Sequence, residues 1–263
     1  MRQNVIFLMA IALMATDTTL GFAPHTQDTK IRTTKLQQQT TSDKEDATKE
    51  RRQPWDVLRF VRQSSKFVNL PFTPSKSTSD TIQPGQVIWA PSSKLFFEWA
   101  PLDDVVMGGV SSSKVDNRSG LWKGTVTDAN NGGFVGMRST PPSVKLDLSK
   151  CQGLEWTFQT TNNMPQRLKV VLRDSNDFNG IAWTACINVP ASKNKQKQVT
   201  VKVPLKNLVP SIFAKIVPDA KDFDKSSITA LQLVFSKFEF EGELNPKFKV
   251  GDFDVQVLQV KAY

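Results

Sequence analysis

The sequence predicts an all-β domain, a two-sheet β-sandwich, that runs from about residue 86 to residue 263. Beyond residue 86, apolar residues alternate with polar ones in six separate sets. Half-buried antiparallel strands require this alternation, because successive side chains point to opposite faces of a sheet. No long stretch with the 3.6-residue period of a helix lies between the sets. Two facing sheets that share one core are the simplest architecture for such strands.

Each alternating set predicts one strand. The sets are Leu154, Trp156 and Phe158; Leu168, Val170 and Leu172; Ile181, Trp183, Ala185 and Ile187; Val199, Val201 and Val203; Leu231, Leu233 and Phe235; and Phe253, Val255 and Val257. Residues 162–163, 177–180, 190 and 245–246 are rich in Asn, Asp, Gly and Pro, which mark turns between strands. We expect a short helix or turn over residues 205–216.

The first 21 residues read as a secretory signal peptide. Arg2 is followed by an apolar run over residues 5–15 and then by small residues, in the order that such signals show. The run is too short to span a bilayer as a mature helix.

Residues 22–53 are expected to be a transit-like, unfolded segment. They begin with Phe22-Ala23-Pro24 and continue into a Thr-, Gln- and Lys-rich stretch. This arrangement resembles the bipartite plastid leader of algae whose plastids derive from a red alga, so it predicts plastid localisation through a signal peptide and a transit peptide. A mitochondrial presequence and a plain secretory signal followed by a spacer remain the alternatives.

Residues 54–85 are expected to hold a short amphipathic helix and a proline-rich linker. Trp55, Leu58 and Val61 recur at i, i+3 and i+6, flanked by arginines. Such a helix commonly docks on its own domain. The alternative is a role in docking to a partner or to a membrane surface, which would make the protein peripheral to a membrane.

The residue inventory argues against catalysis and against a cofactor. The one histidine, His25, lies in the leader, so the domain has no Ser-His or Cys-His pair to activate a nucleophile and few ligands for a metal. A domain of this length buries enough surface to need no metal or disulfide for stability. Cys151 and Cys186 are expected to be buried free thiols rather than a disulfide. We therefore expect no enzyme, no cofactor and no metal site.

The net charge of +9 is spread over the chain and predicts no nucleic-acid partner. The one basic run, at Lys193, Lys195 and Lys197, alternates with uncharged polar residues and is typical of a solvated loop. The interleaved aromatic and basic residues that bind single strands are missing from the sequence.

Two glycine-rich segments stand apart from the alternating strands. Gly and Asn tolerate left-handed backbone, so each segment predicts a tight turn, and an alternating strand up to Arg138 follows the second. From the pattern alone, both turns are structural. The residues singled out are Asp103, Asp104, Met107, Gly108, Gly109 and Ser111 in the first segment, and Asn130, Asn131, Gly132, Gly133, Phe134 and Arg138 in and after the second.

At these segments the chain resembles the complex I intermediate-associated protein 30 family. The matching pieces are residues 104–111, 122–126 and 130–134, Arg138, and residues 251–253. The resemblance extends over about residues 88–263. It departs from the family pattern at residues 160–166, where relatives often carry a Gly-Asp-Gly turn, and at Gly136, where Ser is more usual.

The resemblance implies a galactose-binding-like jelly-roll sandwich with a non-catalytic role. It implies an assembly factor or chaperone whose partners are subunits or assembly intermediates of a membrane electron-transfer complex. That complex is of the complex I type, or a thylakoid complex if the chain is targeted to plastids. No catalytic residues follow from it.

The alternative function is a carbohydrate-binding module, since sandwiches of this shape often bind sugars. A sugar platform would need exposed Trp99, Trp122 or Trp183, although Trp183 lies in an alternating set and is expected in the core. A calcium site at Asp103, Asp104 and Asn130 is a third hypothesis.

Asp103 and Asp104 are unsuited to acid–base catalysis, because adjacent strand residues point to opposite faces. We expect one of the two carboxylates to accept hydrogen bonds from the backbone of the turn at residues 107–109. Met107 and Phe134, beside the glycines, are either client contacts or core residues.

Overall fold

The computed structural model describes residues 54, 56–67, 79–93, 95–190 and 197–263. The chain divides into two units, Met1–Arg51 and Arg52–Tyr263, and all of the described residues belong to the second. The predicted signal peptide (1–21) and transit-like segment (22–53) therefore lie outside the described residues, and so does Trp55.

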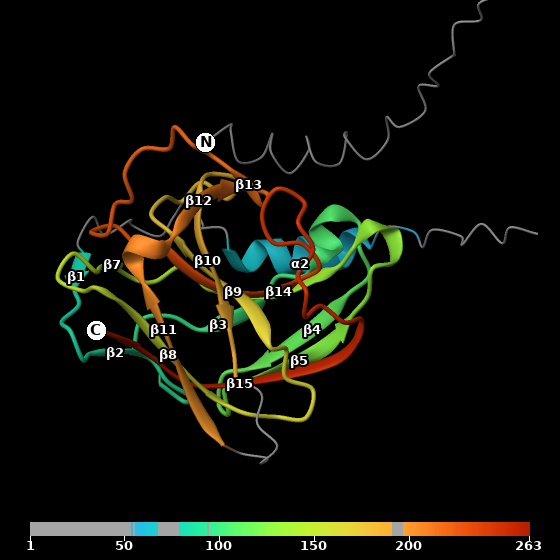
Figure 1. The fold of residues 1–263 in the computed structure, drawn as a ribbon, viewed down its shortest axis with the longest axis horizontal. Helices are drawn as coiled ribbons and strands as arrows, with labels where there is room; N and C mark the ends of the chain where they lie inside the picture. The colour runs from blue at the N-terminus through green and yellow to red at the C-terminus, as the bar shows by residue number, and fades with distance from the viewer. Residues whose placement is uncertain (1–53, 55, 68–78, 94, 191–196) are drawn as a thin grey trace, which may run out of the picture. The chain divides into compact units, whose positions relative to one another are not determined.

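One layer of the domain is a seven-stranded antiparallel sheet (Figure 1). Its strand order is β13-β12-β10-β9-β14-β6-β3, and each neighbouring pair runs antiparallel. The strands are β13 (Lys215–Ile216), β12 (Val209–Ile212), β10 (Ala182–Asn188), β9 (Arg167–Arg173), β14 (Ala230–Ser236), β6 (Phe134–Ser139) and β3 (Trp99–Pro101).

The second layer is a six-stranded antiparallel sheet of order β11-β8-β15-β5-β4, with β2 also paired to β15. Its strands are β11 (Gln198–Pro204), β8 (Gly153–Gln159), β15 (Gly251–Ala262), β5 (Leu121–Val126), β4 (Ser112–Asp116) and β2 (Val87–Trp89). The long strand β15 serves both β5 and β8, and its register with β8 shifts between Val257 and Gln259. A parallel pair, β1 (Ser79–Thr81) and β7 (Lys145–Asp147), completes the strands.

The core lies between the two sheets and is built from the alternating sets. Leu168, Val170 and Leu172 of β9 are buried in one apolar cluster with Trp156 and Phe158 of β8. The tryptophans pack on one another, because their rings lie 5.8 Å apart for Trp89 and Trp99 and 5.9 Å apart for Trp99 and Trp156. The predicted all-β, galactose-binding-like jelly-roll sandwich is confirmed, and each of the six sets lies in or beside its own strand.

Two segments differ from the sequence prediction. Residues 205–216, expected to be a short helix or turn, form a single 3₁₀ turn, η4 (Leu205–Asn207), and then β12 and β13. The domain also begins before residue 86, since β1 pairs with β7 and Ile82 is fully buried in the core. Both differences involve strands of two to four residues, which are too short to display a period-two pattern.

Cys151 and Cys186 are both free thiols, as predicted, although Cys186 is only partly buried.

Within the described part of the chain, no helix has the length and apolarity needed to cross a membrane.

Candidate functional site

Both glycine-rich segments fold into short 3₁₀ turns that end in left-handed backbone. The first turn, η2 (Asp104–Met107), ends at Gly108, whose φ is +86°. The second, η3 (Ala129–Asn131), contains Asn130 at φ 56° and precedes Gly133 at φ +125°. The left-handed conformations expected from Gly and Asn are present.

The carboxylate of Asp104 joins the two turns from inside the protein. Asp104 is fully buried. It accepts hydrogen bonds from the backbone N–H of Ser111 at 2.9 Å, from the Ser111 hydroxyl at 2.6 Å and from the backbone N–H of Gly133 at 2.8 Å. One carboxylate therefore satisfies donors from both segments, which lie far apart in sequence. We expected the backbone N–H groups of residues 107–109 to be the donors, and this was wrong, because the donors are Ser111 and Gly133. The expectation that the carboxylate has a structural role was correct.

The close approach of this carboxylate explains two of the glycines. A Cβ atom on Gly109 would lie 2.5 Å from Oδ1 and 2.7 Å from Oδ2 of Asp104, and a Cβ atom on Gly132 would also collide with Oδ2. Asn130 adds a second link between the segments, since its side-chain amide donates to the carbonyl of Gly108 at 3.3 Å. Gly109 and Gly132 are thus required by packing against Asp104.

The neighbouring carboxylate, Asp103, is fully buried but bonds to different partners. It accepts from the backbone N–H and the hydroxyl of Ser113, at 2.9 and 2.5 Å. Gln63 donates to Oδ2 at 2.9 Å and accepts from the backbone N–H of Asp103 at 3.1 Å. Arg59 forms an ion pair with the same oxygen at 2.9 Å and also donates to the carbonyl of Ser111. Asp103 thereby ties the N-terminal helix to the sandwich.

Burial shifts the pKa of Asp103. Removal of the carboxyl group from water raises its pKa, while the hydrogen bonds from Ser113 and Gln63 and the charge of Arg59 act in the opposite direction. The first effect is the largest, so the net direction is upward.

The helix that reaches Asp103 is α2 (Val57–Ser64), followed by the 3₁₀ turn η1 (Ser65–Phe67). Asp56 caps α2 by accepting from the backbone N–H of Arg59 at 2.9 Å. The predicted helix exists, but its docking face consists of Phe60 and Gln63, with Arg59 beside them. Leu58 and Val61, from which the amphipathic face was predicted, are exposed, Leu58 by 84%.

Sequence reasoning missed Arg59 and Gln63 as site residues. They are four positions apart, so they lie on one face of α2, and that spacing is the one signal in the sequence that points to them. Their partner Asp103 lies 40 residues beyond Gln63.

The arrangement leaves neither carboxylate free for chemistry. Both are enclosed and hold protein donors, so the hypothesis of a calcium site at Asp103, Asp104 and Asn130 has no open ligands to support it. No group of three or more acidic, histidine or cysteine side chains suited to a metal occurs among the described residues.

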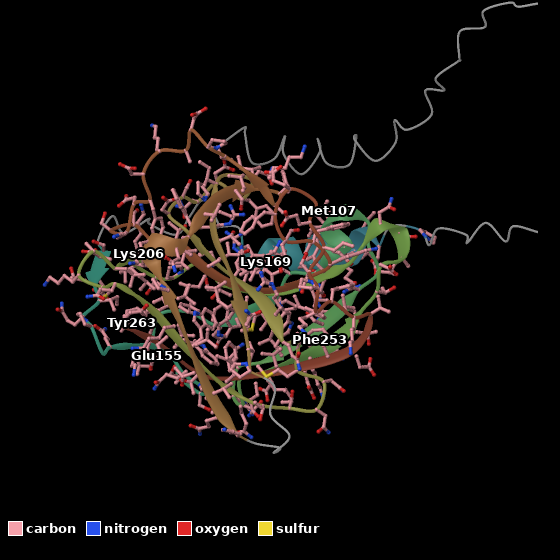
Figure 2. The ribbon with its side chains drawn as sticks, viewed as in Figure 1. Met107, Glu155, Lys169, Lys206, Phe253 and Tyr263 are labelled. Carbon is pink, nitrogen blue, oxygen red and sulfur yellow. The ribbon has the colours of Figure 1, made fainter. Side chains whose placement is uncertain are left out.

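The other predicted residues occupy contrasting positions. Met107 is 67% exposed, so the interpretation of Met107 as a core residue was wrong. Figure 2 shows it on the side of the domain that carries α2, and α2 packs against η2. Phe134 is half-buried at the start of β6, and Arg138 is buried near the end of that strand.

None of the tryptophans proposed as a sugar platform is exposed. Trp99, Trp122 and Trp183 are all buried in the core cluster. Trp122 packs on Phe253 with ring centroids 4.8 Å apart, and the indole of Trp183 donates to Asp174 at 3.0 Å. These three residues therefore provide no aromatic surface for a carbohydrate.

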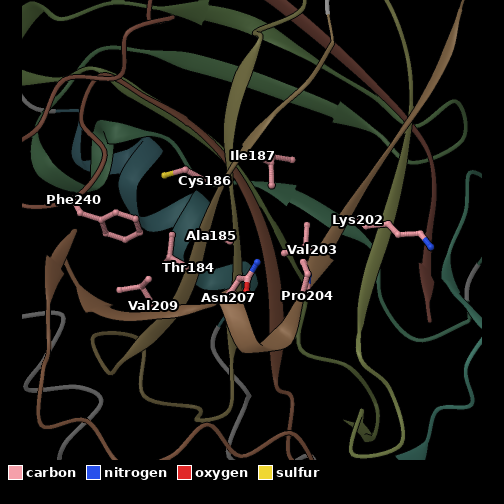
Figure 3. Close-up of a pocket in the computed structure, with 10 residues that line it drawn as sticks. All are labelled: Thr184, Ala185, Cys186, Ile187, Lys202, Val203, Pro204, Asn207, Val209 and Phe240. Atoms are coloured by element: carbon pink, nitrogen blue, oxygen red, sulfur yellow. The ribbon is translucent and has the colours of Figure 1, made fainter.

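A hollow of about 260 Å³ lies at the edge between β10 and β11 (Figure 3). Cys186 and Phe240 lie at one end of it and Lys202 at the other. Burial, followed by the charge of Glu239, raises the pKa of Cys186 to about 11, so this thiol is protonated at neutral pH. A protonated thiol is a poor nucleophile.

The fold and the site define a β-sandwich domain whose glycine-rich turns are fixed by buried carboxylates. The chain belongs to the family described as Complex I intermediate-associated protein 30 (CIA30), because the family model matches residues 90–257, more than half of the chain. The family resemblance found at the glycine motifs is thus confirmed. No curated protein sequence matched the chain.

Solved structures with a similar fold are distant in sequence. A family 11 carbohydrate-binding module from Clostridium thermocellum, in complex with a β-1,3-1,4-mixed-linked tetrasaccharide, is 13% identical, with a TM-score of 0.44 over 68% of this chain and 95% of that chain. The family 11 module of the cellulosomal cellulase Lic26A-Cel5E from the same organism is 15% identical, with a TM-score of 0.41 over 68% and 94%. The agarase AgWH50C is 11% identical, with a TM-score of 0.42 over 69% of this chain and 25% of that chain. These likenesses concern the fold alone.

Proposed function

We propose that this protein is a non-catalytic assembly factor for a multisubunit membrane electron-transfer complex. The observation that carries the proposal is the family match over residues 90–257, since the name of the family refers to an intermediate of complex I. Membership implies a role in complex I assembly in general terms. The enclosed carboxylates and the protonated Cys186 thiol are consistent with a domain that binds rather than catalyses.

The proposed partners are subunits or assembly intermediates of that complex, bound by a surface beside the glycine motifs. Met107 on η2 and Val57, Leu58 and Val61 on α2 are exposed apolar side chains on two elements that pack against each other. Exposed apolar groups gathered in one region commonly mark a protein contact. A client that is part of a membrane complex would hold this chain at the membrane surface.

The cellular site of the proposed function is the plastid, with a thylakoid complex as the client. Its support is the Phe22-Ala23-Pro24 segment after the apolar leader. A mitochondrial location with a respiratory client is the alternative outcome.

Localisation of the full-length chain in native cells, followed by mass spectrometry of co-purifying proteins, tests the proposal. A C-terminal tag leaves the leader free. A plastid signal with thylakoid subunits supports both the assembly role and the plastid location. A mitochondrial signal with complex I subunits supports the assembly role and contradicts the plastid location. Recovery of no electron-transfer subunits from either organelle would contradict the assembly role.

The surface is tested by Met107→Asp in the same purification. We expect loss of the client with a change in the free energy of unfolding below about 0.5 kcal/mol, because Met107 is exposed. Ile216→Asp is the matched control, because Ile216 is also exposed but lies on β13, at the opposite edge of its sheet from β3, the strand that leads into η2. Client retention by Met107→Asp, or equal loss in the control, would rule out this surface.

A further inference from the structure

The outer face of the seven-stranded sheet carries several basic side chains. In β9 the alternation that sends Leu168, Val170 and Leu172 into the core sends Lys169 and Arg173 to the opposite face. On the neighbouring strands, Gln232 of β14 lies directly opposite Arg138 of β6. Three adjacent strands of this sheet thus carry polar side chains on a face that points away from the core.

Arg138 is enclosed on this face with its charge unmatched. Its residue exposure is 6%, and its guanidinium carbon lies 5.4 Å from the ring centroid of Phe67 and 4.9 Å from that of Phe178. The two rings contact the cation, as in cation–π pairs. Its Nε and Nη1 atoms are buried and have no hydrogen-bond partner in the described part of the chain.

The neighbours of Arg138 bring further buried donors that lack partners. Gln232, 7% exposed, has a buried amide nitrogen, and Arg173 has a buried Nε, both without partners among the described residues. Arg173 uses its Nη1 for the carbonyls of Asp177 and Gly180, at 3.2 and 3.1 Å. The charge that acts on Arg138 is that of Arg173, which has the same sign, whereas the carboxylates of Asp177 and Asp174 act on Arg173. Of these two arginines, the one without a counter-charge among the described residues is therefore Arg138.

Such a cluster is costly unless something supplies acceptors. Native proteins pair nearly all of their buried polar groups, and a buried cation without a counter-charge is strongly unfavourable. Burial and the nearby Arg173 lower the pKa of Arg138 to about 9, so the side chain is still charged at neutral pH. Glu239, the acid on this side of the sheet that forms an ion pair, is engaged by Arg167.

We propose that Arg138, Gln232 and Arg173 form a binding site for a small ligand that carries a carboxylate or phosphate group. A guanidinium is a charged donor that binds the oxygens of an oxyanion, and the amide nitrogen of Gln232 supplies a further donor. The ligand is small, because Arg138 is only 6% exposed and a folded protein surface cannot reach its guanidinium.

The N-terminal helix forms one wall of the proposed site. Phe67 lies in η1, directly after α2, and α2 is fastened to Asp103 through Gln63 and Arg59. The segment formed by α2 and η1 therefore contacts both Asp103 and the proposed oxyanion site.

Calorimetric titration of the purified full-length protein tests the site, with inorganic phosphate as one probe and succinate as another, against sodium chloride at equal ionic strength. We expect saturable binding of at least one of the two oxyanions and a higher Tm in its presence. Phosphate binding alone or succinate binding alone identifies the group that the site takes. No saturable binding of either probe overturns the proposal.

The variant Arg138→Gln should weaken binding by at least about tenfold, because it removes the charged partner of the oxyanion. The control Arg118→Gln, which changes an exposed arginine in a turn, should leave binding within about twofold. Equal affinity in Arg138→Gln and in the unchanged protein contradicts the assignment.

A second variant keeps the test decisive if Arg138→Gln fails to fold. Gln232→Glu places a carboxylate directly opposite Arg138 and nearly preserves side-chain volume. We expect it to raise the Tm and to abolish the response to phosphate and succinate, because the protein then carries its own counter-charge. A lower Tm, or an unchanged response to the probes, would show that the cluster is not an oxyanion site.

Discussion

Asp103 and Asp104 are adjacent in the sequence and equally buried, yet they hold different parts of the molecule together. Asp104 bonds to Ser111 and Gly133 and so fixes the two glycine-rich turns to each other. Asp103 bonds to Ser113 on β4 and to Gln63 and Arg59 on α2. One carboxylate therefore stabilises the interior of the motif, whereas its neighbour attaches a helix from outside the sandwich.

The two aspartates differ in what they stabilise, since Asp104 stabilises the sandwich itself and Asp103 stabilises the attachment of α2 to it. The partners of Asp104 are backbone groups and a hydroxyl that are themselves buried, so they cannot turn to water when the carboxylate is lost. Arg59 is partly exposed and can recover water contacts if α2 detaches. Loss of Asp104 should therefore damage the whole domain, and loss of the Asp103 contacts should act mainly on the helix.

The largest expected effect is that of Asp104→Ala. The substitution leaves the buried N–H groups of Ser111 and Gly133 without their acceptor and leaves the Ser111 hydroxyl only the carbonyl of Thr127. We expect a loss of about 3–5 kcal/mol in the free energy of unfolding. Urea denaturation measures it. Asp252→Ala, at an exposed carboxylate on β15, should cost less than about 1 kcal/mol, and similar losses for the two variants would refute the distinction.

Gly109→Ala should have the next largest effect. The new methyl group would lie 2.5 Å from Oδ1 of Asp104, so the turn or the carboxylate must shift, at a cost of about 1–3 kcal/mol. Thermal and urea unfolding check this value. An unchanged stability would mean that the glycine is not required by the approach of Asp104.

Gln63→Ala should release α2 with little effect on the sandwich. The two hydrogen bonds to Asp103 disappear, and we expect the amide hydrogens of residues 60–64 to exchange at least about tenfold faster while the Tm of the domain changes little. Arg62→Ala, an exposed neighbour on the same helix, is the control. A global loss of protection in Gln63→Ala would show that α2 is integral to the sandwich.

The smallest expected effect is a pH dependence at Asp103. Burial raises the pKa of Asp103 in the folded state above its ordinary value of 3.8. Protonation of Asp103 therefore stabilises the folded state at a pH below 3.8, and this stabilisation is lost as the pH rises through the folded-state pKa. The variant Asp103→Asn has no such titration, because an amide does not ionise. Its stability relative to the unchanged protein should therefore increase from pH 4 towards pH 7 in urea denaturation, and a constant or falling difference would contradict the raised pKa.

The strands could be predicted from the sequence because their side chains alternate between core and solvent. Leu154, Trp156 and Phe158 of β8 show the pattern plainly, since all three are buried while the residues between them are partly exposed. β12 and β13 escaped prediction because strands of four and two residues offer too few positions for a period to appear. The two glycine-rich turns were predictable from Gly and Asn, which tolerate the observed left-handed backbone at low cost.

The contacts of the candidate site could not be predicted in the same way. Gln63 meets Asp103 across 40 residues, and no local pattern specifies a pairing at that distance. The face of α2 was predicted from apolar residues, whereas a glutamine and an arginine make the decisive polar contacts. Arg138 was selected for its place in the motif, and its enclosure between Phe67 and Phe178 became visible only in three dimensions.

Asp104 requires one glycine in each motif, Gly109 and Gly132. A double-mutant cycle between Asp104→Ala and Gly132→Ala tests this requirement most directly. With the carboxylate removed, the methyl group at position 132 no longer meets Oδ2. Urea denaturation of the four proteins should therefore give a double variant more stable than the sum of the single losses by about 1 kcal/mol or more. Strictly additive losses would contradict the claim, because the glycine would then be required by something other than Asp104.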